Sequence, residues 1–363
     1  MGRSSLAFLK RLVVSCVLTA GVTFAASAGA LAGAATSTYT LTVVGQFHNT
    51  GRGAVALNDR GHVTSEGIGN AAFLYNGSLH SLGKPAGAAW SIGEGISNGD
   101  VVSATAQDTN GIRRAYAVTY TNGRAHWTPL PGLAGYTLSE ADAITPDGSS
   151  IVGTLCRTGD RACSGAKRPL LAAVWRRAGG VWRQPILVPG GKSSGGARGI
   201  AIARAGSVTV AAAGNIVWPL HAGSFLALRT PGKDTVSAVE SMAHARGNTF
   251  FVAGQSSNPN IGSITEALLW TVRCTHARCI QTDRRVLTNY SAAFAVNSAG
   301  VVAGYSRPNE DGGGFYLIWE GNTTSQLPIE PFGINSSGQL AGLGQNPKTF
   351  RIDQVALLTP SSS

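Results

Sequence analysis

The sequence predicts an all-β protein, namely a single β-propeller of seven blades with about four strands in each blade. Three observations lead to this prediction. The composition is rich in turn formers, with 48 glycines and 15 prolines in 363 residues, and only 13% of the residues are charged. A hairpin pattern with a glycine at its turn recurs seven times, and a short apolar segment that ends in an aromatic residue follows most of these hairpins. Repeats of this length favour propellers or solenoids, so six or eight blades and an open β-solenoid are the alternatives.

The hairpin is clearest over residues 294–304, where two short apolar strands flank a turn that begins with asparagine and ends with glycine. Asparagine and aspartate side chains bond to their own local backbone, and glycine adopts positive φ without a steric cost. We therefore assign structural turn roles, at spacings of 38 to 58 residues, to Gly61, Gly99, Gly148, Gly206, Gly247, Gly300 and Gly338. The same role is assigned to Asn58, Asn98, Asp147, Asn297 and Asn335. The second copy, over residues 96–102, reads as one residue tighter than the others.

The segment after each hairpin ends in one aromatic residue, as at Tyr75, Tyr120, Trp175, Trp218, Trp270 and Trp319. One aromatic at a fixed place in each repeat is expected to pack between blades, although a sugar-stacking platform is the alternative. The apolar segment 39–44 precedes the first hairpin as a fourth strand precedes the later ones. We expect it to join the last repeat beside residues 355–358, which would place both ends of the chain in one sheet.

Residues 1–28 have the features of a cleaved secretory signal peptide. Arg3, Lys10 and Arg11 precede an apolar run over 12–26, and small residues allow cleavage between Ala28 and Ala32. A retained anchor and lipidation of Cys16 are the alternatives. We expect a linker over 29–38, a propeller over 39–360 and a disordered tail over 361–363, with the product in the periplasm or outside a Gram-negative bacterium. No later segment has the roughly 18 apolar residues that cross a bilayer.

Removal of the signal lowers the formal net charge from +11 to +8, because it takes away three basic and no acidic residues. This charge suits polyanionic neighbours, although it also serves solubility alone. Four cysteines then remain, and their short spacings favour structural disulfides between Cys156 and Cys163 and between Cys274 and Cys279. His276 lies between the second pair, but one histidine does not make a zinc site, and we predict no metal and no cofactor.

The layout resembles the bacterial HAF extracellular repeat family. The hairpins over 57–61, 296–304 and 334–338 carry this resemblance, and the segment 71–75 matches the family's third strand. The resemblance extends over most of residues 39–360 and is strongest at the two ends. Ala71 and Glu266 stand where the family has a histidine. The resemblance implies an exported repeat protein and brings no particular reaction with it.

Motifs for catalysis are weak. Residues 191–195 have the Gly-x-Ser-x-Gly spacing but lie in a loop with no helix after it, and residues 309–314 resemble a calcium loop only in composition. Five carboxylates lie near hairpins that could face a propeller mouth, namely Glu66, Glu94, Glu140, Asp142 and Glu240. Turn or surface positions are the ordinary interpretation of such residues.

Two functional classes follow from these observations. The first is an exported, monomeric binding or scaffold module for a glycan, a polyanion or surface polymer, or an envelope protein, without specific nucleic-acid binding. The second is a propeller-fold polysaccharide lyase or glycoside hydrolase, which would need at least two carboxylates within about 5–10 Å. Fold alone does not decide between them. An aromatic and amide-lined mouth would favour the binding module.

Overall fold

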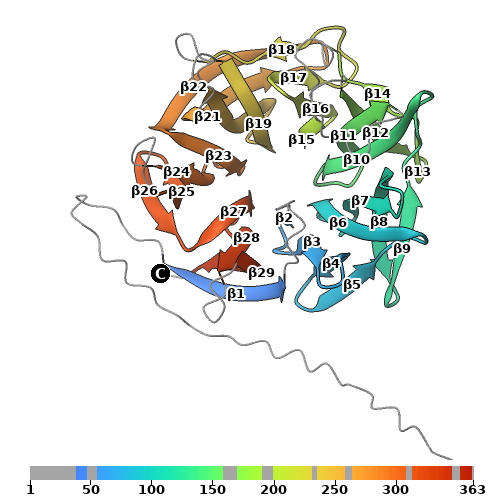
Figure 1. Cartoon of the computed structure of the whole chain (residues 1–363). Helices are drawn as coiled ribbons and strands as arrows, with labels where there is room; N and C mark the ends of the chain where they lie inside the picture. Colours follow the sequence, from blue (N-terminus) through green and yellow to red (C-terminus); the bar gives the residue numbers. More distant parts are fainter. Residues whose placement is uncertain are drawn as a thin grey trace, which may run out of the picture.

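The computed structural model describes residues 38–46, 55–157, 170–189, 199–230, 235–257, 264–307, 313–345 and 352–361. Within these residues the strands form seven antiparallel sheets arranged in a ring (Figure 1). No α-helix occurs among the described residues, and therefore none that is long and apolar enough to cross a membrane. The predicted seven-bladed propeller is thus confirmed.

Each blade is numbered by its place in the chain, and its strands run from the centre of the ring outward. Blade 1 contains β2 (Val55–Leu57), β3 (Val63–Gly67), β4 (Ala71–Tyr75) and β5 (Leu79–Gly83). Blade 2 contains β6 (Ala88–Ile96), β7 (Val102–Asp108), β8 (Arg113–Thr121) and β9 (Arg124–Pro129). Blade 3 contains β10 (Tyr136–Ile144), β11 (Ser150–Arg157), β12 (Leu171–Ala178), β13 (Val181–Trp182) and β14 (Ile186–Leu187). Blade 4 contains β15 (Gly199–Ala205), β16 (Val208–Ala213), β17 (Ile216–Pro219) and β18 (Leu226–Ala227).

The remaining three blades repeat the same order. Blade 5 contains β19 (Thr235–His244), β20 (Thr249–Ser257), β21 (Ile264–Cys274) and β22 (Cys279–Asn289). Blade 6 contains β23 (Ser291–Val296), β24 (Val302–Ser306), β25 (Phe315–Glu320) and β26 (Thr323–Leu327). Blade 7 contains β27 (Ile329–Ile334), β28 (Leu340–Gln345), β29 (Ile352–Pro360) and, as its outermost strand, β1 (Tyr39–Gln46).

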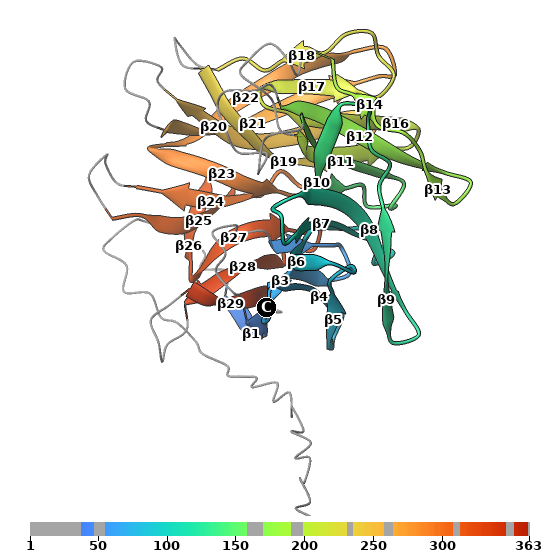
Figure 2. The same cartoon turned by 45° about the vertical axis from the view of Figure 1, so that its right-hand side comes forward.

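The ring is closed by strands from the two ends of the propeller. β1 pairs antiparallel with β29, with Tyr39 opposite Pro360 and Gln46 opposite Gln354. In both cartoon views the blue β1 lies beside the red β29 (Figures 1 and 2). The sequence-based expectation that 39–44 joins the last repeat is therefore confirmed. Because a segment far away in the sequence completes blade 7, the ring cannot open without breaking a ladder of strand pairing.

Hydrophobic packing is divided among the seven seams between blades. One buried cluster lies in each seam, and each cluster draws side chains from two neighbouring blades. Tryptophans on the third strands reinforce three seams. The indole nitrogens of Trp175, Trp270 and Trp319 donate to Pro131 O, Arg229 O and Thr288 Oγ1 at 2.7 to 2.8 Å, and each acceptor belongs to the end of the preceding blade or to the segment that leaves it. The predicted role of these aromatics between blades is confirmed.

The turns between the first and second strands use glycine as expected in six blades. Gly61, Gly300 and Gly338 have φ of 77 to 79°, and Gly148, Gly206 and Gly247 have φ of 54 to 71°. The second copy differs from the prediction. Asp100, with φ of 59°, takes the left-handed position there, and Gly99 does not. The amide of Asp100 donates to Ser97 O as the amide of Gly61 donates to Asn58 O, so this turn has the same length as the others and is not tighter.

The Cys274–Cys279 disulfide closes the end of the β21–β22 hairpin, as predicted. Cys156 is also disulfide-bonded. Its predicted partner Cys163 lies outside the described residues, as do the signal segment, residues 191–195 and most of 309–314.

Candidate functional site

The centre of the ring contains an open cavity of about 890 Å³. It is lined by the innermost strand of every blade, namely β2, β6, β10, β15, β19, β23 and β27, which surround the centre in Figure 1. Ligands of propellers and barrels commonly bind at such a mouth, where several elements each present one side chain. We therefore treat this central channel as the candidate site.

A β-bulge at one fixed place of the innermost strand supplies much of the lining. In β6 the pairing with β7 shifts between Gly93 and Gly95, so Glu94 is left without a cross-strand partner. The same shift occurs in five further innermost strands, where the residues skipped by the strand register are Asp142, Ile200, Glu240, Phe294 and Phe332. All six bulge residues line the cavity. A bulge redirects a side chain and is therefore a device that places functional groups.

In four of the six bulged blades the strand opposite the bulge carries a glycine, because a carbonyl of the bulged strand lies against it. A Cβ atom added to Gly304 would lie 2.0 Å from Ala292 O, and one added to Gly342 would lie 1.9 Å from Glu330 O. Gly153 and Gly254 face the bulges of blades 3 and 5 in the same way. These four glycines are required because a neighbouring backbone carbonyl leaves no room for a Cβ atom, and not because of a positive φ.

The lining has two chemically different parts. On blades 6 and 7, Phe294 and Phe332 stack with ring centroids 6.2 Å apart and an interplanar angle of 9°. Blades 2, 3 and 5 contribute carboxylates from Glu94, Asp142 and Glu240. Thr105 Oγ1 donates to Glu94 Oε2 at 2.9 Å, and Thr154 Oγ1 donates to Asp142 Oδ2 at 3.1 Å. The second strand thus orients two of the carboxylates.

The other two carboxylates singled out in the sequence lie outside the channel lining. Glu66 and Glu140 are fully buried within the blades. Glu140 Oε1 accepts a charged hydrogen bond of 2.6 Å from Arg113, whose guanidinium also lies over the Trp90 ring. Burial of this carboxylate is offset by that pairing, as is usual for buried ions. Glu140 therefore has a structural role at the seam of blades 2 and 3.

Asparagines of the inner turns form a chain of bonds from blade to blade along the channel rim. Asn297 Nδ2 donates to Asn335 O at 3.0 Å, Asn335 Nδ2 to Asn58 O at 3.1 Å, and Asn58 Nδ2 to Ser97 O at 2.8 Å. The Oδ1 atom of each asparagine accepts amides of its own turn at 2.9 to 3.1 Å. Each amide side chain therefore shapes one turn and fastens it to the next blade.

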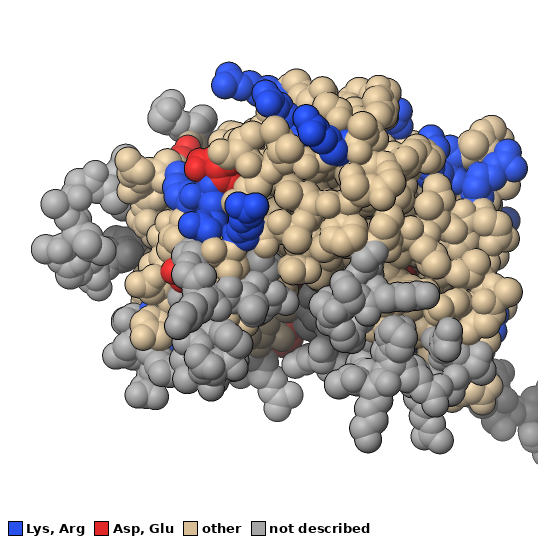
Figure 3. All heavy atoms as spheres, turned by 90° about the horizontal axis from the view of Figure 1, so that it is seen from above, with Lys and Arg blue, Asp and Glu red and all other residues tan. Residues whose placement is uncertain are grey.

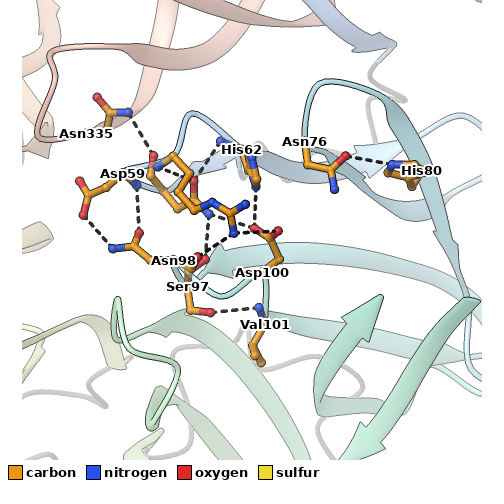
Figure 4. A network of polar contacts seen from close by, with 11 residues as sticks. Asp59, His62, Asn76, His80, Ser97, Asn98, Asp100, Val101 and Asn335 are labelled. Carbon is orange, nitrogen blue, oxygen red and sulfur yellow. Dashed lines mark hydrogen bonds and ion pairs between the residues drawn. The ribbon is translucent and has the colours of Figure 1, made fainter. Parts of the chain in front are cut away.

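Asp59 adds a second link across the same rim (Figure 4). Its carboxylate accepts the Ser336 amide at 3.0 Å and the Asn98 side-chain amide at 3.1 Å, so it connects blades 7, 1 and 2. Burial alone would raise the pKa of Asp59, but these hydrogen bonds outweigh it and hold the pKa below its ordinary value. Asp100 lies nearby and accepts from His62 Nδ1 at 2.7 Å and from Asn58 Nδ2 at 3.2 Å.

The seams on either side of blade 4 use other contacts. At the seam of blades 3 and 4, Arg204 pairs with Asp147. Burial would raise the pKa of Asp147, but hydrogen bonds from Thr145 and Ser149, with the charge of Arg204, lower it. At the seam of blades 4 and 5, Ser207 Oγ lies 3.0 Å from His276 Nε2 in a shallow hollow of about 330 Å³. The histidine noted between the cysteines thus contacts a serine, and no group of three metal-ligating side chains occurs among the described residues.

Sequence reasoning grouped the five carboxylates together and missed the two phenylalanines. In blades 2, 3, 6 and 7 the signal that separates them is position, because the bulge residue stands three places before the first residue of its turn, as Glu94 does before Ser97 and Phe294 before Asn297. In blades 4 and 5 the strand stays paired beyond that point, so Ile200 and Glu240 do not follow this spacing.

Comparison with known proteins supports the fold and does not identify a family. No protein-family model matches the chain, and no curated protein matches it. A chain from the crystal structure of a mitotic checkpoint complex matches with a TM-score of 0.53 at 10% identity, over 94% of this chain and 100% of that one. A Xanthomonas campestris gluconolactonase (TM-score 0.40, 12% identity, 89% and 90% coverage) and an Aleuria aurantia lectin mutant in complex with Fucalpha1-6GlcNAc (0.41, 9%, 78% and 97%) are more distant.

Proposed function

We propose that this chain is an exported recognition module that binds the end of a carbohydrate chain in the central channel. One observation carries the proposal, namely that six blades each contribute one bulge residue to the lining of a single cavity. Bulges interrupt the strand ladder, so their recurrence at this one level is explained by the lining they produce.

The chemistry of the lining suits a sugar. The stacked rings of Phe294 and Phe332 offer an apolar surface for the C–H face of a pyranose ring. The carboxylates of Glu94, Asp142 and Glu240 accept hydrogen bonds from hydroxyl groups. The mouth is also lined by Asn98, whose amide is part of the rim network. An aromatic and amide-lined mouth is the arrangement expected of a binding module.

Export is part of the proposal. The Cys274–Cys279 disulfide supports it, since such bonds persist mainly in oxidising compartments. Membership in the HAF repeat family is likewise a proposal. It is supported by the hairpins of blades 1, 6 and 7, in which the motif's asparagine and glycine have the defined roles of blade link and left-handed turn.

A second candidate is a polysaccharide lyase or glycoside hydrolase that uses the same channel. The observation in its favour is that carboxylates from three different blades line one cavity. Paired carboxylates at suitable separation are the usual machinery of glycoside hydrolysis.

The test is a glycan array with purified protein, followed by incubation of every bound glycan and analysis for product. Binding should weaken at least about tenfold in Phe332→Ala and remain unchanged in Phe225→Ala, which removes an exposed aromatic (42% exposed) from blade 4 outside the channel lining. Melting curves establish that both variants are folded. If the wild-type protein forms product and Glu94→Gln does not, the hydrolytic proposal replaces the binding proposal. Equal binding by wild type and Phe332→Ala would overturn the channel as the site.

A further inference from the structure

Charge is distributed unevenly around the ring. Among the described residues, blades 3–5 contain eleven arginines and six acidic residues, whereas the other four blades and their connections contain six basic and eight acidic residues. All the described basic residues of blades 3–5 are arginines. Figure 3 looks at the outer wall of this half, where basic side chains form several separate groups and acidic side chains are few.

Most acidic side chains of blades 3–5 are directed away from this outer wall. Glu140 is buried against Arg113, Asp142 and Glu240 line the channel, and Asp147 pairs with Arg204. Asp283 is exposed and forms no ion pair with a described residue, and its carboxylate accepts the backbone amide of its own neighbour Arg284 at 2.7 Å. Glu266, the sixth acidic residue, is half-buried, and its carboxylate accepts from Ser256 Oγ at 3.4 Å. The positive charge of the outer wall is therefore largely uncompensated.

Two hairpins carry most of the exposed guanidinium groups. The β12–β13 hairpin of blade 3 carries Arg176, Arg177 and Arg183, and the β21–β22 hairpin of blade 5 carries Arg273, Arg278 and Arg284. None of these six forms an ion pair with another described residue.

Among the described residues, carbonyl groups and one imidazole ring, and no carboxylate, contact the blade 3 arginines. Arg177 Nε donates to Gly180 O at 3.2 Å, Arg183 Nη2 to Ala178 O at 3.3 Å, and Arg176 Nη1 lies 2.7 Å from His221 Nε2. Such contacts position the guanidinium groups without neutralising their charge. Each arginine keeps further N–H groups that can donate to an anion.

We propose that this surface, the arginine wall of blades 3–5, binds an anionic polysaccharide. Arginine remains charged at every physiological pH and donates two parallel hydrogen bonds to a carboxylate, sulfate or phosphate group. A polymer with regularly spaced acidic groups can contact the hairpins of blades 3 and 5 together. The wall and the central channel are separate sites, so either can fail without the other.

The side chains between the arginines favour a polysaccharide over a nucleic acid. Proteins that bind single-stranded nucleic acid place aromatic rings beside the basic residues so that bases stack on them. The exposed large hydrophobic residues described in blades 3–5 are aliphatic at Val181, Leu187, Ile280 and Val286, and Phe225 is the one aromatic among them. The wall offers charge with little surface for base stacking.

The experiment measures binding of the full protein to immobilised dextran sulfate and polygalacturonate, with neutral dextran as the uncharged reference and single-stranded DNA as the nucleic-acid arm. The variants are a blade 3 triple, Arg176→Gln with Arg177→Gln and Arg183→Gln, and a blade 5 triple, Arg273→Gln with Arg278→Gln and Arg284→Gln. The matched control removes the same charge from blade 2 and the segment leading into it, through Lys84→Gln, Arg114→Gln and Arg124→Gln. All nine substitutions are at positions exposed to solvent or on the surface of a hairpin or loop.

We expect each wall triple to weaken binding to at least one acidic polysaccharide about tenfold or more, and to reduce the dependence of log affinity on log salt by about 2. The control triple should stay within about twofold of wild type. Equal losses in the wall and control triples would mean that net charge alone drives binding and would overturn the proposal. Tighter binding to single-stranded DNA than to both acidic polysaccharides, or no binding beyond neutral dextran, would overturn it as well.

Discussion

The asparagine chain along the rim predicts a large loss of stability for the single-atom exchange Asn297→Asp. Asn297 is 3% exposed. Its Oδ1 accepts the amides of Ala299 and Val301 at 3.0 and 3.1 Å, and its Nδ2 donates to Asn335 O at 3.0 Å. Aspartate keeps the acceptor but puts a second oxygen against the Asn335 carbonyl.

The magnitude follows from what is lost at that one contact. A net hydrogen bond contributes about 0.5–1.5 kcal/mol, and leaving buried partners unsatisfied costs about 1–3 kcal/mol more. We therefore expect Asn297→Asp to lower the free energy of unfolding by about 2–4 kcal/mol at pH 7. Asn297→Ala, which removes all three bonds, should lower it by about 3–5 kcal/mol. The neighbouring exposed substitution Ser298→Ala should change it by less than about 0.5 kcal/mol.

The assay is urea unfolding at several pH values, with the slope compared among variants before the midpoints are interpreted. The facing Asn335 carbonyl repels the ionised form of the introduced carboxyl group, and the protonated form can donate to Asn335 O. The difference between Asn297→Asp and wild type should therefore shrink as the pH falls from 7 toward 4. A variant as stable as wild type at pH 7, or a difference that does not depend on pH, would refute the role of the amide as an inter-blade link.

Three further outcomes are expected. Gly304→Ala should destabilise by about 1–3 kcal/mol, because the new methyl group meets Ala292 O, whereas Gly313→Ala, which meets nothing within 4 Å, should be close to neutral in a thermal melt. Burial raises the pKa of Glu330, and the hydrogen bond from the Tyr316 hydroxyl offsets this only in part, so ionisation of Glu330 above about pH 4.5 destabilises the fold. Glu330→Gln should therefore raise the melting temperature at pH 7 and leave it unchanged at pH 3. A melting temperature that is unchanged at both pH values would contradict this. Thiol titration of the unfolded, unreduced protein without residues 1–28 should detect no free thiol, and four after reduction.

The architecture was accessible from the sequence because each blade repeats the same local signals. Gly300 and Gly338 mark the turns, Trp270 and Trp319 mark the third strands, and 39–44 has the pattern of an outer strand. These signals are local in the chain. The prediction for the turn of blade 2 was wrong by one residue, because Asn98-Gly99 is a common turn pair in sequences. In the structure Asn58 bonds to Ser97 and Asp100, and the left-handed residue is Asp100, one position later.

The candidate site was only partly accessible from the sequence. The sequence identified Glu94, Asp142 and Glu240 as carboxylates near hairpins that could face the channel. It identified Glu66 and Glu140 in the same way, but these two are buried. Apolar residues such as Phe294 are indistinguishable from core residues until the bulge is seen. Whether a side chain enters the channel or a seam depends on a one-residue shift in strand pairing, and that shift is not encoded in residue type.

The recurrence of the bulge also separates the chemistry of the channel from the integrity of the scaffold. A bulge residue stands outside the regular register of its strand pair and its side chain faces the cavity, so we expect its identity to be constrained chiefly by what occupies the cavity. Six positions of this kind, one on each of six blades, form a binding surface that can be varied combinatorially while turns, seams and closure stay constant. A library randomised at Glu94, Asp142, Ile200, Glu240, Phe294 and Phe332 should yield folded proteins with new specificities, which makes this propeller a starting point for engineered receptors.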